Sequence, residues 1–175
     1  MSEKPNRWYC DECGEPITRA KDGWLEWRKV GPNGERSEGF RIVHHFSASP
    51  RASGVRQGGC YYSEPPAGSD VLISNMHLEH FTDPLDGLAR LTTSLQPSGA
   101  RTADTAGVLE VIRRLHVPLW EEARRLWPLV AEDWDGWNGH AGPMPFDQEL
   151  LTCILREAAN AGDERAKELV GSVLH

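Results

Sequence analysis

The pattern of polar and apolar residues in the first third of the chain predicts short strands. Residues 23–30 and 40–44 are rich in β-forming residues and alternate between two faces. An Asn33-Gly34 turn signal lies between the two segments, so we expect a β-hairpin. The second strand would return His44 to the level at which the hairpin begins.

The pattern becomes helical after residue 69. Asp83 and Pro84 are typical of the start of a helix, and apolar residues recur at helical spacing beyond them. The expected helices cover residues 85–95, 105–115, 118–132, 147–161 and 163–174. Because a Pro/Gly-rich stretch precedes them, the sequence predicts a β-rich module over residues 1–66 and a helical domain over residues 67–175. The expected fold class is α+β, with the hairpin module packed on a bundle of four to five helices.

Charge is shared unevenly between these two parts. The chain has 175 residues and a net charge of −7. Residues 1–66 carry ten Lys/Arg against nine Asp/Glu, a balance of +1, whereas residues 67–175 carry nine against seventeen, a balance of −8. Because phosphate backbones attract clustered positive charge, the helical part is a poor general nucleic-acid binder. The basic residues between positions 28 and 56 leave nucleic acid as an alternative partner for the β-rich part.

The compartment can be inferred from what the chain lacks. No stretch approaches the ~18 consecutive apolar residues of a membrane span, and no apolar run follows Met1 as in a signal peptide. We therefore expect a cytoplasmic protein with no membrane partner. In a reducing compartment a Cys-x-x-Cys pair is more often a metal clip than a disulfide.

Three of the four cysteines lie in the β-rich part, which is too small to bury a large core without a metal or disulfides. Cys10 and Cys13 form a Cys-x-x-Cys pair followed by Gly14, and Cys60 follows the predicted hairpin. Two thiols separated by two residues can bind one metal ion from a tight turn. A distant His and Cys can complete a tetrahedral Zn²⁺ site.

The histidine ligand is a question of strand geometry. Neighbouring residues on a strand point to opposite faces, so His44 and His45 cannot both reach one metal without a bulge. His44 shares a face with Phe40 and Ile42 and is favoured, with His45 as the alternative. The predicted metal ligands are therefore Cys10, Cys13, His44 and Cys60.

Other chemistry is less well supported by the sequence. Redox use of the Cys-x-x-Cys pair would need a thioredoxin-like βαβ context, which the pattern lacks. Four protein ligands would close the zinc shell, which is typical of a structural site and not of a catalytic one. Residues 105–115 and 118–127 could form a DNA-reading helix-turn-helix, although an αα-hairpin is more common. Trp134 and Trp137 could cover the helical core or form a binding patch.

The β-rich part resembles a known kind of module. Cys10-Asp-Glu-Cys13-Gly, the predicted hairpin with its tryptophans, His44 and Cys60 are similar to zinc-ribbon-like modules of uncharacterised bacterial and phage proteins. This resemblance covers about 55 residues and implies that the four ligands share one structural zinc ion. It implies nothing about activity, because such ribbons serve nucleic acids, proteins and stability alike.

The sequence favours a non-enzymatic zinc protein that acts as a protein-interaction module. Acidic helices and tryptophans suit protein contacts better than phosphate contacts. The alternatives are a nucleic-acid-binding or regulatory protein that uses the basic residues of the zinc module, and an enzyme with a site between the two parts. No residue is assigned a catalytic role.

Overall fold

The computed structural model shows a mixed α+β fold, which confirms the predicted class. The structure describes residues 7–51, 59–61, 68–83, 85–93, 102–130 and 148–173. Contacts divide the chain into two compact units, Met1–His116 and Val117–His175, here called unit 1 and unit 2. The boundary expected between residues 66 and 67 falls inside unit 1.

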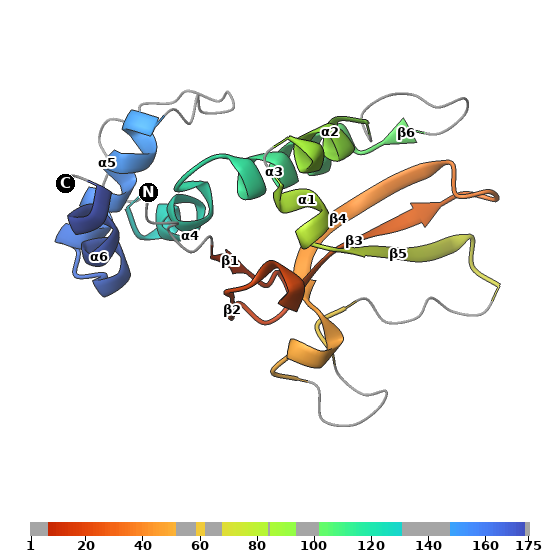
Figure 1. The fold of residues 1–175 in the computed structure, drawn as a ribbon, viewed down its shortest axis with the longest axis horizontal. Helices are drawn as coiled ribbons and strands as arrows, with labels where there is room; N and C mark the ends of the chain where they lie inside the picture. Colours follow the sequence, from red (N-terminus) through yellow and green to blue (C-terminus); the bar gives the residue numbers. More distant parts are fainter. Residues whose placement is uncertain are drawn as a thin grey trace. The chain divides into compact units, whose positions relative to one another are not determined.

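A four-stranded sheet is the centre of unit 1 (Figure 1). Strands β3 (Gly23–Val30) and β4 (Arg36–His44) form the predicted antiparallel hairpin. Gly23 pairs with His44, so the second strand does return this histidine to the level of the hairpin's start. The register of the hairpin shifts between Glu26 and Arg28, where β4 contains an irregularity.

The sheet has two further strands that the sequence pattern did not predict. Strand β5 (Val71–His77) pairs antiparallel with β3, and β6 (Thr102–Ala103) pairs parallel with β4, which gives the order β5-β3-β4-β6. The expectation of purely helical structure after residue 69 was therefore wrong. Residues 71–77 complete the sheet because they extend β3 on its open side.

Short elements precede and follow the hairpin. Strands β1 (Trp8–Tyr9) and β2 (Pro16–Ile17) form a two-stranded antiparallel sheet around the Cys-x-x-Cys turn. The 3₁₀ turn η1 (Ala20–Asp22) leads into β3, and η2 (Phe46–Ala48) follows β4. These elements place the N-terminal turn and the segment after β4 close to the end of the hairpin that carries His44.

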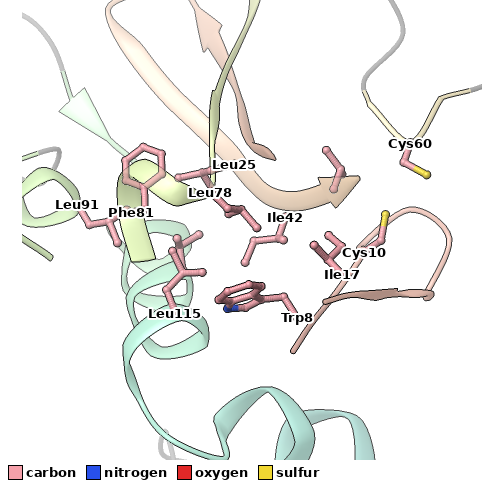
Figure 2. Packing of buried hydrophobic residues seen from close by; sticks show 12 residues of the cluster. Trp8, Cys10, Ile17, Leu25, Ile42, Cys60, Leu78, Phe81, Leu91 and Leu115 are labelled. Carbon is pink, nitrogen blue, oxygen red and sulfur yellow. The ribbon is translucent and has the colours of Figure 1, made fainter. Parts of the chain in front are cut away.

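Three helices pack with the sheet in unit 1: α1 (Glu79–Thr82), α2 (Asp86–Thr93) and α3 (Thr105–His116). Asp83 accepts hydrogen bonds from the backbone N–H groups of Leu85 and Asp86, as expected of a residue at a helix start. Helix α3 contributes Leu115 to the apolar core shown in Figure 2. In that view Leu91 lies at one end of the core and the pair Cys10 and Cys60 at the other.

Unit 2 contains α4 (Trp120–Val130), α5 (Gln148–Asn160) and α6 (Glu164–Val173). The fully buried residues of α5 repeat at helical spacing and pack against Trp120, as the sequence pattern predicted. The predicted loop with Trp134 and Trp137 lies outside the described residues. None of the helices in the described segments is long and apolar enough to cross a membrane.

Candidate metal centre

The Cys-x-x-Cys pair lies on a tight turn between β1 and β2. The N–H of Gly14 donates to the carbonyl of Cys10 over 2.9 Å, and the N–H of Cys10 donates to the carbonyl of Glu15 over 3.0 Å. Gly14 has a φ of +76°, a conformation that glycine adopts without a steric penalty. The turn therefore presents the thiols of Cys10 and Cys13 on the same side.

His44 reaches this turn from the last position of β4. Its Nδ1 lies 3.4 Å from the Sγ of Cys13, and its Nε2 lies 3.3 Å from the carbonyl oxygen of Pro16 in β2. A carbonyl oxygen can only accept, so the tautomer that fits this contact carries its proton on Nε2 and donates to Pro16. This tautomer leaves the lone pair of Nδ1 directed at the thiols, which is how second-sphere hydrogen bonds orient histidine ligands of metals.

Cys60 approaches from the segment that follows η2. Its side chain is fully buried, and its Sγ lies 3.1 Å from the hydroxyl of the buried Ser49. The guanidinium of Arg41 donates to the carbonyl of Cys60 over 3.4 Å. These two contacts fix a residue that is separated from the Cys-x-x-Cys pair by nearly fifty positions.

Together, Cys10, Cys13, His44 and Cys60 form a group that could hold a metal ion. Their ligand atoms all lie within 4.8 Å of one another. In a tetrahedral zinc site, ordinary Zn–S and Zn–N bond lengths place ligand atoms about 3.6–3.8 Å apart. The 3.4 Å between Sγ of Cys13 and Nδ1 of His44 is close to that spacing. The donor set and its geometry therefore fit a four-coordinate ion.

The thiols of this group are in surroundings that disfavour isolated thiolates. Burial raises the pKa of the Cys60 thiol to about 12, and burial also raises the pKa of Cys13. Three thiolates packed together are costly without a positive charge between them. A divalent cation would offset both the burial and the mutual repulsion, and its binding would release thiol protons.

The alternative ligand His45 lies elsewhere. Its ring packs against Trp24 with centroids 4.5 Å apart and stacks on His77 at 4.8 Å. Its Nδ1 lies 2.7 Å from the hydroxyl of Ser47. Burial, followed by the neighbouring His77, lowers the pKa of His45. His44 therefore lies in the group and His45 lies outside it.

Sequence reasoning missed the charged side chains that surround the group. Asp11, between the two cysteines of the turn, accepts from Arg114 of α3 over 2.6 Å. Its neighbour Glu12 lies 3.0 Å from Arg41 and 2.8 Å from Arg51. No local pattern could have identified Arg114, because it is 103 positions away from Asp11.

Three other histidine and cysteine residues of the described segments are not part of the group. His77 ends β5, and His80 is an exposed residue of α1. Cys153 is a half-buried thiol of α5 in unit 2. Within the part of the chain that the structure describes, one cluster of His, Cys, Asp and Glu is suited to a metal. It consists of Cys10, Cys13, His44 and Cys60.

Comparisons with known proteins give no relative. No family model, no curated protein and no solved structure matches the chain.

Proposed function

We propose that the chain is a zinc-binding protein whose zinc is structural and that it acts as a non-enzymatic protein-interaction module. The observation that carries the first part is the convergence of Cys10, Cys13, His44 and Cys60 within 4.8 Å. These four residues come from three segments that have no local reason to meet. A metal ion would tie the N-terminal turn, the end of β4 and the segment after η2 to one another.

Zinc is proposed because of the donor set. Three thiolates and one imidazole in a tetrahedron are typical of structural zinc, whereas hard cations such as Mg²⁺ and Ca²⁺ prefer oxygen ligands. Four protein ligands leave no position for a substrate or a reactive water. The role we assign to the ion is therefore to hold the fold, in the manner of the zinc-ribbon-like modules that the sequence resembles.

The arrangement of arginines supports a protein partner over nucleic acid. The four described arginines between positions 28 and 51 each pair with a carboxylate, namely Arg28, Arg36, Arg41 and Arg51. In the two helices considered as an alternative helix-turn-helix, Arg114 is buried against Asp11 and Arg124 pairs with Glu121. Arginines already matched with carboxylates offer little net charge to phosphates.

Metal analysis of the purified full-length chain tests the zinc site. We expect one zinc per wild-type chain and a loss of zinc in Cys10→Ser. Cys153→Ser, which removes the thiol of unit 2, is the matched control and should keep the full zinc content. A wild-type chain that binds no zinc when refolded with excess Zn²⁺ would rule out the site.

The class of partner is tested by retention on immobilised DNA, RNA and protein at two salt concentrations. A protein-interaction module should leave DNA and RNA unbound at 50 mM salt, and a protein partner captured from lysate should remain bound after nuclease treatment. Retention on nucleic acid that falls steeply with salt would instead support the nucleic-acid alternative.

A further inference from the structure

The turn that carries Cys10 and Cys13 also holds a helix that is distant in sequence. Between the two cysteines, Asp11 accepts a 2.7 Å hydrogen bond from the N–H of Ile42 in β4. The same carboxylate oxygen of Asp11 accepts from the guanidinium of Arg114 in α3 over 2.6 Å. One side chain of the metal-binding turn therefore contacts both the sheet and the helix that packs on it.

Arg114 is buried, so its charge must be satisfied by partners inside the protein. Its side chain is 4% exposed, and it also donates to the carbonyl of Tyr9, in β1, over 2.9 Å. A buried guanidinium is tolerated when carboxylates and carbonyls satisfy it, and losing one charged partner is strongly destabilising. Both of these acceptors lie next to Cys10. The burial of Arg114 thus depends on the conformation of the Cys-x-x-Cys turn.

Glu12 connects the same turn to the segment of the fourth ligand. Its two carboxylate oxygens lie 3.0 Å from Arg41 and 2.8 Å from Arg51. Arg41 in turn donates to the carbonyl of Cys60. Asp11 and Glu12, which lie between Cys10 and Cys13, therefore contact two distant parts of the chain. Asp11 pairs with Arg114 of α3. Glu12 pairs with Arg41 and Arg51, close to Cys60.

We propose that metal binding at the Cys3His group and the ordering of α3 are coupled, and that the Asp11–Arg114 ion pair carries this coupling. The inference rests on the proposed zinc site and adds a regulatory role to it. With the turn closed around an ion, Asp11 is fixed where Arg114 needs it. Once the ion is removed, the turn loosens, the contact between Asp11 and the buried guanidinium weakens, and α3 opens more often. Since α3 is the last element of unit 1, its opening changes the segment from which unit 2 continues.

Hydrogen exchange of the full-length chain, with Zn²⁺ bound and after chelation, tests the coupling. In wild type, we expect chelation to speed amide exchange in α3 by about tenfold, the lower end of what outer-shell contacts contribute to metal affinity. Exchange in α5 of unit 2 should stay unchanged and serves as an internal reference. In Arg114→Met, α3 should exchange fast already with Zn²⁺ bound and should respond little to chelation.

The coupling must be reciprocal, so Zn²⁺ affinity is a second measurement. Competition with a chromophoric chelator should show binding about tenfold weaker in Arg114→Met than in wild type. Arg113→Met is the matched control, because Arg113 is the neighbouring residue of the same helix and its side chain is 43% exposed. This control should keep the wild-type affinity and the wild-type exchange response.

The results separate the inference from the proposed function. A wild-type chain that binds one zinc but shows no change in α3 exchange on chelation overturns the coupling and leaves the zinc site standing. The same is true if Arg114→Met responds like wild type. If Arg114→Met does not fold, Asp11→Asn replaces it: an amide oxygen can still accept from Ile42, but the charge facing Arg114 is gone. We expect the same weakening of Zn²⁺ binding, and unchanged affinity in a folded Asp11→Asn overturns the coupling.

Discussion

The two units of the chain hold their cores together in different ways. In unit 2, helices α4–α6 meet through apolar side chains that recur at helical spacing, and the contacting helices follow one another in sequence. In unit 1, the apolar core is continuous with Cys10 and Cys60, and the buried Glu26 and Arg114 each pair with a residue of another element. Unit 1 therefore depends on buried contacts and ion pairs between segments that are distant in sequence, whereas unit 2 depends on apolar residues at helical spacing.

Removal of the metal should give the largest difference between the units. Structural zinc contributes about 10–16 kcal/mol in zinc-finger peptides. Unit 1 also has an apolar core, so we expect chelation to open the segments that carry Cys10, Cys13 and Cys60, to loosen α3 and to leave α4–α6 helical. Limited proteolysis with peptide mapping, with and without chelator, measures this directly. Cleavage should concentrate within residues 7–61. If chelation exposes both units equally to protease, the units do not differ in their dependence on the metal.

The second-largest difference between the units is expected from substitutions in their apolar cores. Leu151 is fully buried in α5, so Leu151→Ala should destabilise unit 2 by about 2–5 kcal/mol and leave zinc content unchanged. Ile42→Ala should have a similar cost in unit 1 but should also weaken Zn²⁺ binding, because Ile42 packs in the core that contains Cys10 and Cys60. Urea unfolding and zinc analysis of both variants test the contrast.

The control for these core variants is Leu129→Ala, at a position that is 57% exposed in α4. It should change the free energy of unfolding by less than about 0.5 kcal/mol. A large loss of zinc in Leu151→Ala would contradict the separation of the two units.

The sequence predicted elements whose signals are local. The hairpin follows from alternation around Asn33-Gly34, and α3 follows from apolar spacing; both occur as expected. The position of His44 could also be predicted, because the hairpin decides where it returns and which face it shares. These features need no knowledge of distant segments.

The features that the sequence did not predict depend on contacts between segments that are distant in the chain. Residues 71–77 carry no alternation that marks a strand, and they become β5 because β3 offers them an open edge. The partnership of Asp11 with Arg114 joins the two ends of unit 1 and leaves no periodic signal. The predicted division at residue 66 used a Pro/Gly-rich stretch, whereas the contacts place β5 and α1–α3 with the hairpin.

Alanine substitutions at two glycines with positive φ, one in each unit, should give a smaller difference in Zn²⁺ binding. Gly14 in the metal-binding turn has a φ of +76°, and Gly162 between α5 and α6 has a φ of +102°. An added Cβ would meet no atom within 4 Å at either position, so the cost of alanine is backbone strain, roughly 1–2 kcal/mol. Gly14→Ala should also weaken Zn²⁺ binding in chelator competition, and Gly162→Ala should not. Equal affinities in the two variants would contradict this.

The smallest expected effect concerns pH and the last residue of unit 1. Burial lowers the pKa of His116 below its ordinary value of 6.5, against the opposing effects of the Phe81 carbonyl and Asp83. Its Nε2 has no hydrogen-bond partner among the described residues. The unfolded chain therefore binds a proton at this histidine more readily than the folded chain does. Stability from this group is complete above pH 6.5 and is lost as the pH falls through the lower folded-state pKa.

Urea unfolding at pH 7.5 and 5.5, in excess Zn²⁺, should show that His116→Gln loses less stability on acidification than wild type. The difference between the two proteins isolates His116, because proton competition at the thiols affects both equally. His80→Gln, at an exposed position of α1, controls for the loss of a histidine. If His116→Gln and wild type lose the same stability, the half-buried His116 adds nothing to the pH dependence of unit 1.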